Sequence, residues 1–130
     1  MGISTAKAAL RARDVFRRGG LLAKWHPRFE YRPGQLAMAE EVEAALAERR
    51  HLLVEAGTGT GKTLAYLFPV IASGKRVIVS TGTKALQEQL FYQDVPFIED
   101  RLGRELRVAY MKGRANYLCR EKLYGAENRP

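Results

Sequence analysis

A glycine-rich loop, residues 55–63, constrains the fold of this chain more than any other feature. The loop reads Glu-Ala-Gly-Thr-Gly-Thr-Gly-Lys-Thr, and it departs from the phosphate-loop pattern only at Ala56, where the pattern has glycine. Glycines allow left-handed backbone angles, so successive N–H groups can converge on phosphate oxygens. The start of the following helix favours the same anion. The loop therefore predicts a binding site for a nucleoside triphosphate, with ATP as the expected ligand.

The spacing assigns a role to each position of this loop. Lys62 is placed to reach the β- and γ-phosphates and the Thr63 hydroxyl to ligate Mg²⁺, so these two are the candidate catalytic residues. The other candidate cofactor-binding positions of the loop are Ala56, Gly57, Thr58, Gly59, Thr60 and Gly61. A chance Gly/Thr-rich turn is the alternative, and the apolar run before the loop and the helix-forming run after it argue against that alternative.

A second candidate element lies upstream, in Arg32-Pro33-Gly34-Gln35. A glutamine that opens a helix before a phosphate-loop strand can accept from and donate to an adenine edge at once. This signal is weak by itself, and a capping or solvent-facing role for Gln35 explains it equally well.

Short apolar runs alternate with helix-forming runs along the chain, which predicts an α/β fold with a parallel sheet and flanking helices. The expected strands are residues 51–55, 76–80 and 106–111. The expected helices are one from Ser4 to a stop at Gly19-Gly20, residues 34–48, one from about Lys62 with a bend near Pro69, residues 83–92, and a short one to about Leu102 after a break at Pro96. Because a sheet of this type usually has more than three strands, the predicted sheet is truncated.

The net charge of +8 is concentrated at the two ends of the 130-residue chain, which is long enough for one domain. Residues 1–32 carry eight Lys or Arg against two acidic residues, and residues 106–130 carry six against two. Basic ends suit a polyanion such as a nucleic acid or a membrane surface, and a merely solvated basic surface explains them equally well.

Nothing in the sequence predicts a membrane segment. The longest apolar stretch, residues 64–72, is about half of what a bilayer span needs, and the N-terminal residues have no apolar signal core. We expect a cytoplasmic protein, with an organelle transit peptide as the less favoured alternative for the Arg-rich start. Cys119 is the single cysteine, so an internal disulfide is excluded; taken alone, such a residue is most often a small buried hydrophobe.

Four stretches together resemble the superfamily-two DNA helicases. Residues 32–35 look like their Q motif, residues 55–63 like motif I, and residues 77–90, Val-Ile-Val-Ser-Thr-Gly-Thr-Lys-Ala-Leu-Gln-Glu-Gln-Leu, like motif Ia. Residues 112–119, Lys-Gly-Arg-Ala-Asn-Tyr-Leu-Cys, look like the entry to the iron–sulfur domain of the XPD/DinG branch. Many ATPases share motif I, whereas the combination is far more specific and is most similar to bacterial DinG/YoaA-type helicases.

The resemblance implies a partial RecA-like domain and gives particular residues a function. ATP and Mg²⁺ would lie on residues 56–63, with Arg32 and Gln35 at the adenine. Cys119 would be the first of four cysteine ligands of a 4Fe–4S cluster. Contacts to single-stranded DNA would come from Thr81, Lys84, Lys112 and Arg114. For these four, helix capping or plain solvated charge is the alternative.

The resemblance also implies an organisation for the chain. A basic N-terminal helix would occupy residues 1–20, the N-terminal part of the ATP-binding RecA-like domain residues 21–111, and the start of the iron–sulfur insertion residues 112–130. The whole protein would be a bacterial cytoplasmic helicase that translocates 5′ to 3′ in DNA repair or replication.

The chain departs from the family pattern in three respects. It has no Asp-Glu dipeptide for the Walker B acid, one cysteine where the cluster takes four, and no second RecA-like domain to supply an arginine finger. We interpret it as the front portion of such a helicase, inactive by itself. The alternative is a nucleotide- or DNA-binding module without turnover. A different P-loop enzyme, such as a small kinase, is disfavoured by residues 77–90 and Cys119.

Overall fold

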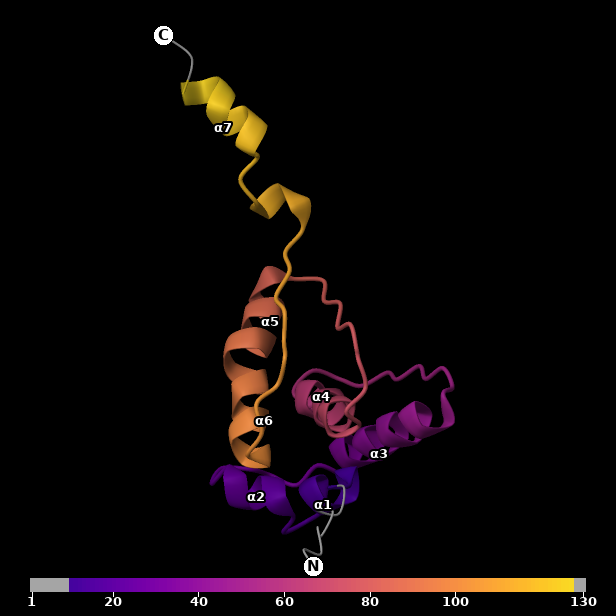
Figure 1. Ribbon diagram of the computed structural model, residues 1–130. Coiled ribbons are helices and arrows are strands. Elements are labelled where there is room, and N and C mark those ends of the chain that lie inside the picture. Colours follow the sequence, from indigo (N-terminus) through magenta and orange to yellow (C-terminus); the bar gives the residue numbers. More distant parts are fainter. Residues whose placement is uncertain (1–9, 128–130) are drawn as a thin grey trace, which may run out of the picture.

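The computed structural model describes residues 10–127, in which helices are joined by extended segments (Figure 1). The elements are α1 (Ala12–Phe16), α2 (Leu21–Trp25), α3 (Pro33–Glu48), α4 (Lys62–Ala72), α5 (Lys84–Gln89), the π-helical turn η1 (Leu90–Asp94), α6 (Val95–Leu102), the 3₁₀ turn η2 (Arg114–Asn116) and α7 (Arg120–Glu127). Among these described helices none is long and apolar enough to cross a membrane.

The core forms where α1, α3 and α4 pack together, with the α5–η1–α6 column against α4. Phe16 and Phe68 meet edge to face at its centre, with their ring centroids 5.9 Å apart. Both rings are almost fully shielded from solvent. The other buried apolar residues of this cluster are Ala12, Val15, Leu22, Ala39, Ala65, Leu67, Leu90, Val95 and Ile98.

The two long helices next to the glycine-rich loop are confirmed. Helix α3 begins with Pro33 in its first turn, where a missing N–H costs nothing, and it ends before Arg49, whose φ of 56° is left-handed. Helix α4 begins at Lys62 and continues through Pro69 to Ala72. The N-terminal helix is shorter than expected, and Ser4 lies outside the described residues. Helix α2 was not among the predicted helices.

The predicted helix break at Pro96 is wrong. The chain stays helical from α5 through η1 to α6 without an interruption, and only the hydrogen-bonding pattern changes. Pro96 has no N–H to donate to the carbonyl four residues earlier, and it lies in the first turn of α6, where that loss is tolerated. The wider π-helical turn just before it accommodates the change in pattern.

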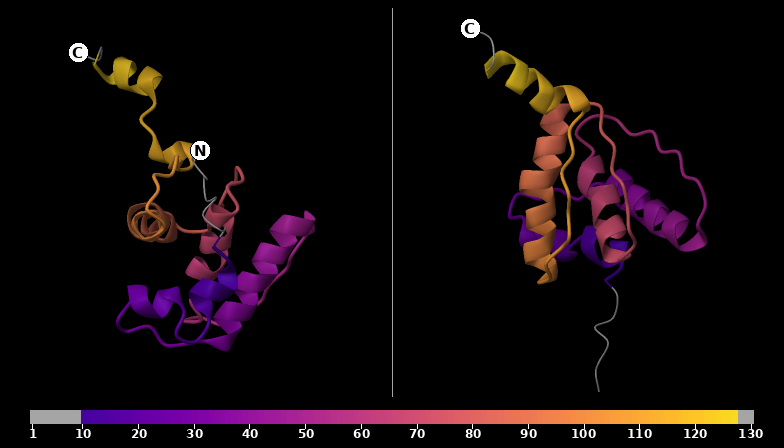
Figure 2. Two further views of the ribbon diagram at one scale, coloured as in Figure 1. Left: turned by 60° about the horizontal axis from the view of Figure 1, so that its bottom comes forward. Right: turned by 45° about the horizontal axis from the view of Figure 1, so that its top comes forward.

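The structure differs from the predicted sheet, because no strand is present among residues 10–127. The three segments predicted as strands are instead unpaired connections. Some of their apolar side chains face solvent: Leu53 is 99% exposed and Ile78 is 94% exposed, whereas Leu106 packs against the core. Figures 1 and 2 show residues 104–113 running alongside the α5–η1–α6 column, with α7 extending away from the rest. Strand pairing requires a partner ladder, and the described residues provide none.

Candidate nucleotide-binding site

The glycine-rich loop connects the exposed segment of residues 51–55 to the start of α4. Gly59 has a φ of 78° and Gly61 a φ of 77°, and both values lie in the left-handed region that favours glycine. Gly61 is also the residue that caps α4, so the loop enters the helix through a left-handed turn. The positions predicted to require glycine for backbone freedom are therefore confirmed at these two residues.

The ammonium group of Lys62 lies inside the loop. Its Nζ donates to the carbonyl of Ala56 at 2.6 Å and to the carbonyl of Gly57 at 2.9 Å. The hydroxyl of Thr60 donates to the same Gly57 carbonyl at 3.0 Å. Lys62 therefore holds a positive charge at the centre of the loop, on the side chain expected to meet the phosphates.

Arg32 and Gln35 reach the same loop from the start of α3. Arg32 donates from Nη1 to the carbonyl of Gly59 at 2.5 Å, and Gln35 donates from Nε2 to the carbonyl of Gly61 at 3.0 Å. Gln35 is 5% exposed, which makes it the buried polar residue of the described core. The structure thus brings both residues to the loop, and their donors meet its backbone. The solvent-facing alternative for Gln35 is wrong.

Two residues near Thr63 were not predicted from the sequence. Tyr66 lies one turn further along α4, where burial raises the pKa of its hydroxyl and a hydrogen bond with Thr63 partly opposes this rise. Asp94, from η1, adds to the rise through its charge. Burial also raises the pKa of Asp94, and a hydrogen bond from Gln89 opposes that shift. The Thr63 side chain is therefore hydrogen-bonded to the Tyr66 phenol, which is itself close enough to Asp94 to be affected by its charge.

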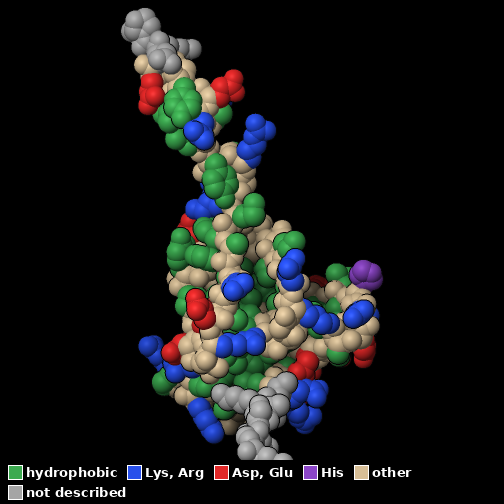
Figure 3. Space-filling model, viewed as in Figure 1, with side chains coloured by type: hydrophobic (Ala, Val, Ile, Leu, Met, Phe, Trp, Pro, Cys, Tyr) green, Lys and Arg blue, Asp and Glu red, His purple; other side chains and the backbone are tan. Residues whose placement is uncertain are grey.

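The residues predicted to contact DNA come from two stretches that meet beside α5. Lys112 pairs with Glu88 at 3.2 Å, and Gln87 donates from Nε2 to the carbonyl of Met111 at 3.4 Å. The hydrogen bond to Glu88 is the main cause of the raised pKa of Lys112. Lys84 and Arg114 are exposed. Lys and Arg side chains are spread over the face in Figure 3 rather than gathered in one patch.

The threonines before α5 have different contacts. The Thr83 hydroxyl accepts from the N–H of Leu86 at 3.3 Å and so caps the helix. The Thr81 hydroxyl donates to the carbonyl of Thr83 at 3.2 Å. Helix capping therefore accounts for Thr83, while Thr81 only braces the turn that precedes the helix.

Cys119 is exposed, so the interpretation of this lone cysteine as a buried hydrophobe is wrong. The described residues contain no group of three or more His, Cys, Asp or Glu that could hold a metal ion. One thiolate cannot hold a cluster that takes about four cysteine ligands. The reactivity of the thiol gives a direct test of whether Cys119 is exposed in the folded chain.

We expect Cys119 in the folded chain to react with a disulfide reagent such as Ellman's reagent nearly as fast as in the denatured chain, because an exposed thiol is not protected. The release of the coloured thiolate measures the rate, and Cys119→Ser is the blank. Labelling that begins only on unfolding would contradict the exposed placement.

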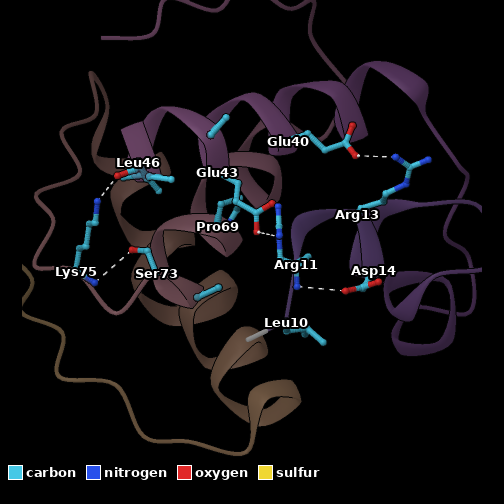
Figure 4. A pocket seen from close by; sticks show the side chains of 13 residues that line it. Leu10, Arg11, Arg13, Asp14, Glu40, Glu43, Leu46, Pro69, Ser73 and Lys75 are labelled. Atoms are coloured by element: carbon cyan, nitrogen blue, oxygen red, sulfur yellow. Dashed lines mark hydrogen bonds and ion pairs between the residues drawn. The ribbon is translucent and has the colours of Figure 1, made fainter. Parts of the chain in front are cut away.

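A cavity lies away from the loop. It has a volume of about 700 Å³ and is open between α1, α3 and the C-terminal end of α4 (Figure 4). Ion pairs Arg11–Glu43 and Arg13–Glu40 line it, and Lys75 donates to the carbonyl of Leu46 across it. The phosphate loop is at the opposite end of α4, so this cavity is not part of the nucleotide site.

Residues 32–127 match the DEAD/DEAH box helicase family, and this range begins at Arg32 and includes the whole phosphate loop. The chain belongs to the DEAD/DEAH box helicase family. Membership of this family implies the RecA-like fold. No solved structure gives a significant match.

Three bacterial relatives show the extent of the similarity. The chain is 50% identical over 110 residues to the ATP-dependent DNA helicase YoaA of Escherichia coli, covering 85% of this chain and 17% of that protein. It is 46% identical over 103 residues to the ATP-dependent helicase DinG of Mycobacterium tuberculosis, covering 73% of this chain and 16% of that protein. It is 39% identical over 106 residues to the 3'-5' exonuclease DinG of Bacillus subtilis, covering 78% of this chain and 11% of that protein. The chain thus spans about a sixth of the length of the relatives it matches most extensively.

Proposed function

We propose that this chain is the ATP-binding front portion of an ATP-dependent DNA helicase of the DinG/YoaA type. The observation that carries the proposal is the loop of residues 56–63, with its two left-handed glycines and with the Lys62 ammonium at its centre. Lys62 would exchange its carbonyl partners for the β- and γ-phosphates, and Thr63 would ligate Mg²⁺ at the start of α4. Bound Mg²⁺ would neutralise phosphate charge during transfer.

The proposal extends to single-stranded DNA. Lys84 and Arg114 are exposed cations, and Lys112 lies where residues 111–112 contact α5, through Gln87 and Glu88. Because Lys112 already forms an ion pair with Glu88, we expect it to contribute less than Lys84 and Arg114 to binding the DNA phosphates. Thr81 would contribute a hydroxyl to the backbone of the strand. Polarity, if it follows the family, would be 5′ to 3′.

We also propose that residues 51–55, 76–80 and 106–111 become parallel strands when neighbouring strands are supplied by the rest of a longer protein. The support is their extended backbone and their exposed apolar side chains. In the same proposal, residues 1–20 form a basic N-terminal segment and residues 21–111 the first part of the ATP-binding domain. Residues 112–130 open the iron–sulfur insertion, with Cys119 as its first ligand.

We expect the 130-residue chain to bind Mg–ATP without turning it over. Phosphoryl transfer requires an oriented water and charge stabilisation around the γ-phosphate in addition to the metal, and the sequence has no Asp-Glu pair to position them. Equilibrium dialysis with labelled ATP measures binding, and a phosphate-release assay with and without single-stranded DNA measures turnover.

Lys62→Ala is the control for both assays. Failure of the parent chain to bind Mg–ATP would refute the assigned site. Phosphate release by the parent that Lys62→Ala abolishes would instead identify a complete small ATPase and contradict the front-portion interpretation.

A further inference from the structure

Helix α4 carries a phenol one turn beyond the phosphate loop. In residues 64–72 of this helix, Tyr66 is the residue whose side chain has a hydrogen-bonding group, and the others are apolar. Residues three positions apart are neighbours on one face of an α-helix, and long side chains lean toward its N-terminal end. Tyr66 accordingly reaches back to the first turn of α4, where it is hydrogen-bonded to the side chain of Thr63.

The effect of this hydrogen bond on Tyr66 indicates which group is the donor. Burial raises the pKa of the Tyr66 phenol, whereas the hydrogen bond with Thr63 lowers it and so favours the deprotonated form. A deprotonated phenol oxygen can only accept, so the Thr63 hydroxyl is the donor of this bond. A hydroxyl that donates its proton keeps the lone pairs of its oxygen, which are what a metal ion takes from a neutral ligand.

Packing restricts the position of the phenol. The Tyr66 side chain is half-buried and packs against the hydrophobic core. The η1 turn also contacts α4, and it brings the charge of Asp94 close enough to affect the pKa of Tyr66. Asp94 in turn accepts a hydrogen bond from Gln89 Nε2 at 3.2 Å. An acceptor on a ring that is packed in this way can hold the Thr63 hydroxyl in one direction.

We propose that Tyr66 is a positioning residue for the Mg²⁺ ligand: it accepts the hydroxyl proton of Thr63 and leaves the lone pairs of the Thr63 oxygen available to the metal. This proposal rests on the nucleotide site proposed above, in which Thr63 ligates Mg²⁺. A tyrosine hydroxyl that only satisfies hydrogen bonding at the edge of the core would affect ATP binding equally with and without the metal. The two roles therefore differ in the Mg²⁺ dependence of ATP binding.

The test measures dissociation constants of ATP for the 130-residue chain by isothermal titration calorimetry, once with Mg²⁺ and once with EDTA in its place. Tyr66→Phe removes the hydroxyl and keeps the ring that packs on the core, and far-UV circular dichroism checks its fold. The matched control is Tyr92→Phe, because Tyr92 is 64% exposed. Thr63→Val, with and without Tyr66→Phe, shows whether the two hydroxyls act together.

We expect Tyr66→Phe to weaken binding of ATP with Mg²⁺ by about three- to tenfold, because one hydrogen bond to the metal ligand is lost. Binding of ATP in EDTA should change by less than about twofold, because no metal is then held by Thr63. Tyr92→Phe should match the parent in both buffers. In the Thr63→Val background, Tyr66→Phe should cause no further loss, because the hydroxyl that it positions is absent.

Equal losses with Mg²⁺ and with EDTA would overturn the proposal in favour of a structural role, and affinities of Tyr66→Phe equal to those of the parent would overturn it outright. A parent chain that binds ATP no better with Mg²⁺ than with EDTA would also overturn it, since Thr63 would then hold no metal. If the parent binds no ATP in either buffer, the nucleotide site itself fails and this proposal with it, and that failure is seen before any variant is compared.

Discussion

Lys62→Ala should weaken binding of Mg–ATP to this chain by about 1.5–3 kcal/mol, which is one to two orders of magnitude in the dissociation constant. Lys62 is the lysine whose ammonium lies within the loop, 2.6 Å from the Ala56 carbonyl and 2.9 Å from that of Gly57. The substitution removes the cation that would bind the phosphates, and it also removes the two hydrogen bonds from Lys62 to the Ala56 and Gly57 carbonyls.

The matched control is Lys75→Ala. Lys75 also donates to a main-chain carbonyl, that of Leu46, but it lies beyond the opposite end of α4. Titration calorimetry of both variants should separate a local effect from a general loss of positive charge. If Lys62→Ala and the parent bind Mg–ATP with the same affinity, the loop is not the phosphate site.

Phe68→Ala should lower the free energy of unfolding by about 3–5 kcal/mol, because a large aromatic side chain is removed from a closed core. Phe68 is 2% exposed and contacts Phe16 edge to face, so its ring joins α4 to α1. A loss of this size is a large part of the stability of a domain of this length. Chemical denaturation followed by circular dichroism measures it.

Leu118→Ala provides the comparison, since Leu118 is 74% exposed and its removal should change the free energy of unfolding by no more than about 0.5 kcal/mol. A cost below about 1 kcal/mol for Phe68→Ala would show that the core is not organised around α4.

The helices and the loop were predictable because their signals are local. The apolar spacing of residues 34–48 and the glycines before Lys62 are confirmed as α3 and as a loop with two left-handed turns. The helix break at Pro96 was predicted wrongly. A proline usually interrupts a helix because it cannot donate a backbone hydrogen bond, but here a π-helical turn precedes it and the chain stays helical.

The contacts of Arg32 and Gln35 with the loop could not be read from periodicity, because they join residues more than 25 positions apart. One signal was available. Gln35 lies four residues before Ala39, which is fully buried, so a polar side chain falls on the buried stripe of α3. A polar residue at such a position needs a hydrogen-bond partner, and the Gly61 carbonyl provides it.

The sheet failed as a prediction of structure for a different reason. Apolar, β-branched runs such as residues 76–80 indicate an extended backbone, and the backbone there is indeed not helical. Pairing is a long-range property that depends on neighbouring strands, and parallel strands are usually buried on both faces. Leu53 and Ile78 are exposed because no neighbouring strand covers them among residues 10–127.

The Lys62 ammonium is hydrogen-bonded to the backbone of its own loop. The ammonium fixes the direction of the Ala56 and Gly57 carbonyls, and the Thr60 hydroxyl is a second donor to the Gly57 carbonyl. In the proposed site, nucleotide binding would be an exchange of partners: Lys62 would give up its two carbonyl contacts and form contacts with phosphate oxygens instead. The free energy of binding would be the difference between the contacts with phosphate and the contacts with the two carbonyls. When the ligand leaves, Lys62 would return to the Ala56 and Gly57 carbonyls.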